Sequence, residues 1–206
     1  MIKFRSVLLQ AIVLPISLPA MCFAQSVMVH VENEAALGCY HEATKVSTIE
    51  GFVVQDEMLS PCNVALDQYG LSDKDRAATF ANRGILYAAQ GSLAEALSDY
   101  DEALELYPTL GEVYLSRGII FHFEKQFGKA IADYSKAIEL QTQAAHLAYC
   151  DRAMAYEELR RWEEAHADYQ KALEIHPDWT PAVARLRWVE DRLHNENQTN
   201  RYLTNR

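Results

Sequence analysis

The chain has 206 residues, with 19 Lys or Arg against 29 Asp or Glu, and a formal net charge of −10. This length is enough for one domain with a substantial core. Because an acidic protein is a poor ligand for nucleic acid or anionic lipid, we expect neither to be its main partner.

The first 24 residues have the pattern of a secretory signal peptide. A short basic start precedes an almost wholly apolar run over residues 7–18, and small residues stand three and one positions before a cut after Ala24. The run is too short to span a bilayer comfortably, and no later apolar stretch is long enough. We therefore predict that residues 1–24 are removed, that the protein is periplasmic or secreted, and that no stable membrane insertion follows cleavage. An uncleaved anchor and a lipid attached to Cys22 are the alternatives.

Residues 25–71 have the pattern of a helical hairpin. A first helix is expected over residues 34–45, and an irregular connection follows it. A second helix begins at Pro61, with Ser60 as its N-terminal cap, because proline is well tolerated in the first turn. That helix ends near Gly70, where a glycine can adopt the left-handed conformation.

Three cysteines follow the signal segment, namely Cys39, Cys62 and Cys150. An exported chain reaches an oxidising compartment, where disulfide bonds persist. Cys39 and Cys62 lie close in sequence, one on each helix of the hairpin, so we predict that they pair. Cys150 is then the odd cysteine. We interpret it as a small packing residue, with a reactive thiol or an intermolecular bridge as alternatives.

Further helices are expected between residues 72 and 194. Ser72 caps the first of them and Gly91 ends it, while Ser92 and Glu95 have the spacing of a capping box for the second. The expected helices span residues 73–90, 93–106, 111–125, 128–140, 144–159 and 162–175.

A closing helix is expected from Thr180-Pro181 to residue 194. Its apolar residues recur at helical spacing, and its other face is polar. Such a half-polar helix suits the end of a stack of helices, because the last layer would otherwise expose its apolar side. The polar residues 195–206 are predicted to form a flexible tail.

One pattern of residues recurs in three copies, offset by 34 and then 35 residues. In each copy an arginine and a small residue are followed by an aromatic residue, an alanine, Asp-Tyr and a second alanine. A period of about 34 residues is typical of a helix–turn–helix solenoid. The small residues let paired helices approach closely, and the aromatic residues fill the space beside them. The small residues are Gly84, Gly118 and Ala153 on the first helices, and Ala96, Ala130 and Ala165 on the second.

This spacing resembles the tetratricopeptide repeat, over about residues 77–178. The resemblance implies an all-α fold: a right-handed superhelical solenoid with a disulfide-tied hairpin in front and a capping helix behind. The expected repeats are residues 77–110, 111–144 and 146–179. The arrangement with a cysteine-paired hairpin is also similar to exported bacterial proteins of this family.

An arginine and an aspartate also recur in each copy, sixteen residues apart. Two antiparallel helices could bring the members of each pair together, within repeats or between neighbours. We predict a structural ladder of ion pairs, with a charged binding strip as the alternative. The pairs are Arg83 with Asp99, Arg117 with Asp133, and Arg152 with Asp168.

The resemblance implies that the first helices of the repeats line a concave groove that binds a partner. The residues expected in this groove are Asn82, Ile85, Ala89, Leu115, Ser116, Ile119, Phe123, Leu147, Asp151, Met154 and Glu158. This lining is apolar at one end and acidic toward the other. Ile119 and Met154 could instead be simple packing residues.

Some members of the family clamp the terminal carboxylate of a peptide with basic residues and asparagine. In this sequence the comparable positions hold Ala81, Ile85, Ser116, Leu147 and Asp151. The basic groups are missing, so chaperone-tail binding is not expected. An extended or helical segment with apolar and basic residues fits the expected lining better.

The sequence offers little support for an enzyme. It contains no Gly-rich phosphate loop, no HExxH and no GxSxG. Cys150 and His146 lie one helical turn apart, but no third group orients them. We therefore expect no catalytic residues, no metal ligands and no cofactor. The expected function is non-covalent binding of a protein or peptide, as an adaptor or assembly factor in the cell envelope. A self-associating structural protein and a regulatory subunit of an envelope enzyme are the alternatives, and a homo-oligomer is possible.

Overall fold

The computed structural model describes residues 29–48, 53–68 and 70–204, and this part of the chain is helical without any strand. The predicted signal peptide lies outside the described residues. The elements are α1 (Glu34–Thr48), a 3-10 helix η1 (Asp56–Leu59), α2 (Ser60–Asp67), α3 (Asp73–Gln90), α4 (Leu93–Leu106), α5 (Gly111–Phe123), α6 (Phe127–Glu139), α7 (Ala145–Glu158), α8 (Trp162–Ile175) and α9 (Thr180–Thr204).

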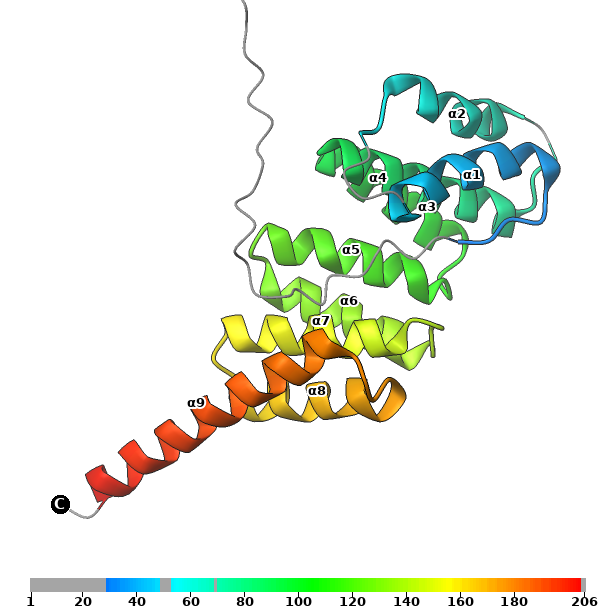
Figure 1. Ribbon diagram of the computed structural model, residues 1–206. Helices are drawn as coiled ribbons and strands as arrows, with labels where there is room; N and C mark the ends of the chain where they lie inside the picture. Colours follow the sequence, from blue (N-terminus) through cyan, green and yellow to red (C-terminus); the bar gives the residue numbers. More distant parts are fainter. Residues whose placement is uncertain (1–28, 49–52, 69, 205–206) are drawn as a thin grey trace, which may run out of the picture.

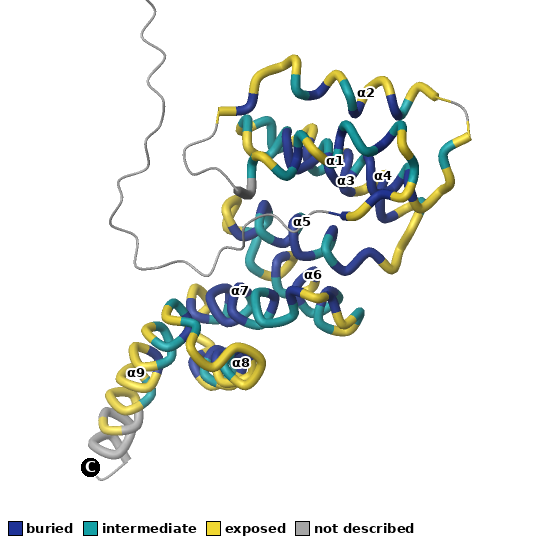
Figure 2. Tube along the Cα trace, turned by 45° about the vertical axis from the view of Figure 1, so that its right-hand side comes forward, coloured by how far each residue is buried: buried dark blue, intermediate teal, exposed yellow. Residues whose placement is uncertain are grey.

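The helices from α3 to α8 form three antiparallel pairs that stack one upon another (Figure 1). Helices α3 and α4 make the first pair, α5 and α6 the second, and α7 and α8 the third. The α1–α2 hairpin packs on α3, and α9 packs on α8. Buried residues lie on the sides of the helices that face their neighbours, and exposed residues cover the outer sides (Figure 2). The predicted all-α solenoid is thereby confirmed.

Close approach within each pair depends on the small residues of the repeat. A Cβ atom added to Gly84 would lie 2.6 Å from Cε1 of Tyr100, and one added to Gly118 would lie 2.7 Å from Cε1 of Tyr134. Such distances are far inside van der Waals contact, so the tyrosine ring occupies the space that a side chain would need. The third tyrosine, Tyr169, is likewise fully buried. These residues set the distance between the helices of each pair.

The predicted disulfide bond between Cys39 and Cys62 is present and joins α1 to α2. Both cysteines are fully buried. The bond fixes the hairpin whose first helix packs along α3. Cys150 is also fully buried, and no cysteine among the described residues is a free thiol. Cys150 is itself disulfide-bonded, so its interpretation as an unpaired packing residue is wrong, and a reactive thiol is not supported.

Two predicted helix caps differ from the structure, while a third is confirmed. The Ser72 hydroxyl accepts the backbone N–H of Asp75 at 3.0 Å, as predicted for a cap of α3. Ser92 makes no side-chain capping bond. Its backbone N–H instead donates to the Tyr87 carbonyl, which closes α3 around the left-handed Gly91. Ser60 is not a cap either, because η1 runs directly into α2 and makes it a helical residue.

Helix α9 is longer than expected, because it continues past residue 194 to Thr204. After Pro181 the sequence contains neither proline nor glycine, so nothing in the backbone ends the helix early. The indole N–H of Trp162 also donates to the Glu196 carboxylate at 2.7 Å and ties this part of α9 to α8. Flexibility of residues 195–206 stays a prediction. No helix in the described ranges is long and apolar enough to cross a membrane.

Candidate functional site

Helices α3, α5 and α7 are the first helices of the three pairs. Helix α3 contacts α5, and α5 contacts α7, so the three form one continuous face, which we call the first-helix face. The predicted groove residues belong to these helices. Three of them are exposed and stand at equivalent positions near the C-terminal ends of the helices: Ala89, Phe123 and Glu158. Two are half-buried, Ile119 and Leu147. Six are buried: Asn82, Ile85, Leu115, Ser116, Asp151 and Met154.

At the first repeat, this face holds an extended segment from the beginning of the described chain. The Val29 N–H donates to Oδ1 of Asn82 at 3.1 Å, and Nδ2 of Asn82 donates to the Val29 carbonyl at 2.8 Å. The amide of Asn82 therefore pairs with both backbone groups of one residue, as a neighbouring strand would. Asn82 is completely buried, so these bonds satisfy a side chain that water cannot reach.

The same segment is held a second time at Asp75, on the N-terminal turn of α3. Oδ1 of Asp75 accepts the N–H groups of Glu32 at 2.8 Å and Asn33 at 3.3 Å, and Oδ2 accepts the Ser72 hydroxyl. Burial raises the pKa of Asp75, but the hydrogen bonds from Glu32, Ser72 and Asn33 outweigh it and lower the pKa below its ordinary value. Sequence reasoning did not find this second anchor.

In the second and third repeats, two of the predicted groove residues interact with the buried tyrosine of the preceding repeat: Ser116 with Tyr100, and Asp151 with Tyr134. The Ser116 side chain forms a hydrogen bond with Tyr100, whose pKa is raised because the ring is buried. Asp151, one repeat further on, is completely buried, and its charge contributes to the raised pKa of Tyr134 after the larger effect of burial.

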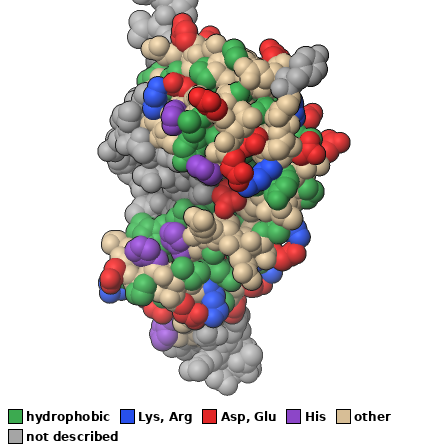
Figure 3. Space-filling view, turned by 90° about the vertical axis from the view of Figure 1, so that its right-hand side faces the viewer, with side chains coloured by type: hydrophobic (Ala, Val, Ile, Leu, Met, Phe, Trp, Pro, Cys, Tyr) green, Lys and Arg blue, Asp and Glu red, His purple; other side chains and the backbone are tan. Residues whose placement is uncertain are grey.

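The far end of the face is closed by a network that the sequence did not reveal. Glu157 is buried, and its carboxylate accepts hydrogen bonds from the Tyr169 hydroxyl and, at 3.0 Å, from Arg185 of α9. Burial raises the pKa of Glu157, and the two donors counteract that rise. This network links three helices, and we assign it a structural role. In the view of Figure 3, acidic side chains are spread over much of the surface, with basic ones scattered among them.

The predicted ladder of ion pairs is present, and every pair lies within its own repeat. Each arginine binds its aspartate through two parallel hydrogen bonds of 2.7–2.8 Å. Each guanidinium also lies between two aromatic rings, three residues before and four residues after it, at 5.5–5.9 Å from the ring centroids. The rings belong to Phe80 and Tyr87, Tyr114 and Phe121, and Tyr149 and Tyr156. The aromatic residue after each arginine was predicted as a packing residue, but sequence reasoning missed its contact with the guanidinium and the second ring three residues before the arginine.

Replacing Asp133 with alanine is expected to lower the free energy of unfolding by about 2–3 kcal/mol, because a largely buried guanidinium loses its two hydrogen bonds to Asp133 and keeps only the exposed Asp101 as an acidic partner. The side chains of Arg117 and Asp133 are 19% and 9% exposed, and the bond to Asp133 raises the pKa of Arg117. Asp101→Ala is the matched control, since Asp101 binds the same arginine but is 67% exposed. Its expected cost is about 0.5 kcal/mol. Chemical denaturation measures both. Unchanged stability together with lost partner binding in Asp133→Ala would support the charged-strip alternative.

A buried histidine on α5 gives the fold an acid-sensitive position. Burial, together with the charge of Arg185, lowers the pKa of His122 to about 4. Between its unfolded value near 6.5 and the folded value, the unfolded chain binds one proton more. The stabilisation from neutral His122 is therefore complete above about pH 6.5 and is lost as the pH falls, by about 1.4 kcal/mol per pH unit. In His122→Leu this slope should be smaller by that amount.

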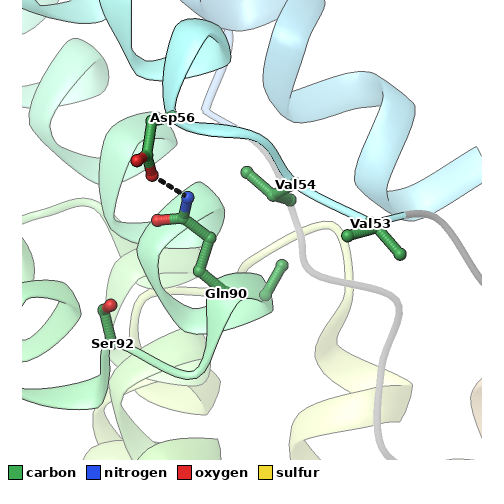
Figure 4. A pocket seen from close by; sticks show the side chains of 6 residues that line it. Val53, Val54, Asp56, Gln90 and Ser92 are labelled. Atoms are coloured by element: carbon green, nitrogen blue, oxygen red, sulfur yellow. Dashed lines mark hydrogen bonds between the residues drawn. The ribbon is translucent and has the colours of Figure 1, made fainter. Parts of the chain in front are cut away.

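A small pocket lies beside the C-terminal end of α3 (Figure 4). Its volume is about 410 Å³, and its lining consists of Val53, Val54, Asp56, Ala89, Gln90 and Ser92. Nε2 of Gln90 donates to Oδ1 of Asp56 at 3.0 Å across it. Ala89 is the one predicted groove residue in this lining.

The described residues bring together no group of three His, Cys, Asp or Glu side chains that could hold a metal ion.

Comparison with known proteins agrees with this architecture. Residues 77–110 and 146–178 match one profile of the tetratricopeptide repeat, and residues 111–143 match another, so the chain contains three tetratricopeptide repeats. Such repeats generally mediate contacts between proteins. The mitochondrial import receptor subunit TOM70 of Mus musculus is 27% identical over 64% of this chain. The match spans only 17% of that receptor.

Two kinds of solved structure are similar. The first tetratricopeptide domain of Spaghetti (RPAP3), bound to the HSP90 peptide SRMEEVD, is 28% identical, with a TM-score of 0.55 over 57% of this chain and 93% of that one. MamA from Desulfovibrio magneticus has a TM-score of 0.63 over 85% of this chain and 94% of that one, at 18% identity. The second similarity shows the fold alone.

Proposed function

We propose that this protein is a non-catalytic binding module that takes a segment of another protein on the first-helix face. The observation that carries the proposal is the extended segment already held there by Asn82, which pairs with its backbone rather than with a particular side chain. A face that satisfies the backbone of its own chain can do the same for a partner. Solenoids use such extended concave surfaces for binding.

The charge of the face favours a partner with apolar and basic residues. Glu158 is exposed in its third repeat, and the repeat arginines are engaged with aspartates. The positions that would clamp a terminal carboxylate hold no basic residue. An acidic peptide such as the one bound to RPAP3 would meet repulsion here, whereas a basic one would be attracted.

Photo-crosslinking from the rim of the face tests the proposal. A photoreactive phenylalanine analogue at Phe123 or Ile119 should capture a defined partner in the native cell. Ala132, which is exposed on α6, provides the matched position on a second helix. Partner crosslinks from Phe123 and Ile119 but not from Ala132 are expected. Crosslinks from Ala132 alone would show that the partner binds elsewhere and would overturn the proposal.

We further propose that the module acts as an adaptor or assembly factor in the cell envelope. The signal-peptide pattern of residues 1–24 supports this location. Mass spectrometry of the protein from its native host should find a chain that begins at Gln25. A chain that keeps its first residues and stays with the cytoplasmic fraction would contradict the location, without bearing on the binding face.

A further inference from the structure

The segment at residues 29–33 has the geometry of a bound peptide. Its backbone is held at one end by the Asn82 amide and at the other by the Asp75 carboxylate. Both anchors belong to α3, and they lie 53 and 43 residues along the chain from the groups they bind. The contacts are therefore tertiary, and the helix presents them as one site.

The side chains of this segment alternate in burial, as they do in an extended strand against a packed surface. Val29 and Val31 are 6% and 2% exposed, while His30 and Glu32 face solvent. The two valines belong to the core cluster of the first repeat, which also contains Ala78, Ala81, Ile85 and Ile120. The site thus accepts two apolar side chains at alternate positions and leaves the residues between them outside.

We propose that residues 29–33 are a built-in ligand of the first repeat, and that a partner binds there by displacing them. The partner would be an extended segment with apolar residues two positions apart. Its backbone N–H and C=O groups would have to be available for hydrogen bonds with Asn82. This inference rests on the proposed function and names the chemistry of the segment that the face takes. Asn82 would form hydrogen bonds with the backbone of the partner segment, and the apolar surface around Ile85 would pack against its two apolar side chains.

A tethered segment competes strongly with a free one. Its effective concentration at the site is on the order of millimolar, so it lowers the apparent affinity for any partner segment. The full-length protein is then expected to bind such a segment weakly at the first repeat. Loosening residues 29–33 should raise that affinity without any change in the site itself.

The test uses a fluorescent peptide with the sequence of residues 27–35 and the full chain in several variants. Val29→Ser/Val31→Ser removes the two apolar contacts of the tethered segment. His30→Ser/Glu32→Ser changes the outward residues of the same segment and is the matched control. We expect the valine variant to bind the peptide at least about ten-fold more tightly than the unchanged chain and the control. Adding Asn82→Ala to the valine variant should abolish the gain.

Equal affinity of the unchanged chain, the valine variant and the control would overturn the inference, and so would a gain that survives Asn82→Ala. The single variants Val29→Ser and Val31→Ser are measured as well, because each loses less packing and keeps the fold if the double variant does not. Circular dichroism verifies helix content in each case. Crosslinking from Phe123 separates the two proposals. If the peptide result is negative but Phe123 still crosslinks to a partner, the built-in ligand is overturned and the proposed function stands. If Phe123 captures no partner, the proposed function is overturned as well.

Discussion

Replacing Tyr134 with alanine is expected to destabilise the protein by about 3–5 kcal/mol, the cost of removing a large aromatic side chain from a packed core. Tyr134 is completely buried, and its ring fills the space that Gly118 leaves on the facing helix. Removing the ring opens a cavity between α5 and α6, at the centre of the stack. Urea denaturation followed by circular dichroism measures the effect.

Tyr134→Phe is the control for this prediction. The Tyr134 hydroxyl makes no hydrogen bond within the described part of the chain, although it is buried. Its removal should therefore change the free energy of unfolding by no more than about 0.5 kcal/mol, or stabilise the protein slightly. A cost below about 1 kcal/mol for the alanine variant, or a large cost for the phenylalanine variant, would contradict the packing role assigned to the ring.

The second large effect is expected at the disulfide bond. Replacing Cys39 and Cys62 together with serine should lower the free energy of unfolding by about 3 kcal/mol, because the bond closes a loop of 23 residues in the unfolded chain. The hairpin also packs along α3 and supplies Asn63, which receives a hydrogen bond from Arg83. Its loosening would therefore weaken the front of the stack.

Reducing agent provides the control for the disulfide. Unfolding of the unchanged protein in reductant should approach that of the serine variant in the same buffer. The difference in the free energy of unfolding between the two proteins without reductant then measures how much the disulfide bond stabilises the fold. Identical unfolding curves for both proteins without reductant would show that the cross-link does not stabilise the folded chain.

Much of the fold could be predicted because the residues that carry it act within one repeat. Gly84 and Tyr100, or Gly118 and Tyr134, meet across a single helix pair, so their spacing in the sequence is enough to place them. The arginine–aspartate pairs were predicted for the same reason. The contacts of aromatic rings with each arginine were missed, although a spacing of three and four residues puts the rings on the same side of one helix.

The occupied state of the first-helix face could not be predicted from the sequence. Asn82 has no feature in its neighbourhood that marks it as the partner of Val29, and the alternation of Val29 and Val31 is too short to predict a strand. The contact depends on the packing of α1 against α3, which brings residues 29–33 alongside α3 and is a tertiary property. The cap at Ser92 failed for a local reason: its backbone (φ −80°, ψ 66°) lacks the extended conformation with which Ser72 (φ −63°, ψ 154°) caps α3.

The central claim is that the first repeat holds an extended segment by its backbone, and amide hydrogen exchange of Val29 tests it most directly. In the full chain this N–H donates to a buried side chain, so we expect it to exchange at least about a hundred-fold more slowly than in an unstructured peptide. In Asn82→Ala the protection should disappear while the amides of α5 and α6 stay protected. A Val29 amide that exchanges at the unstructured rate in the unchanged protein would contradict the account.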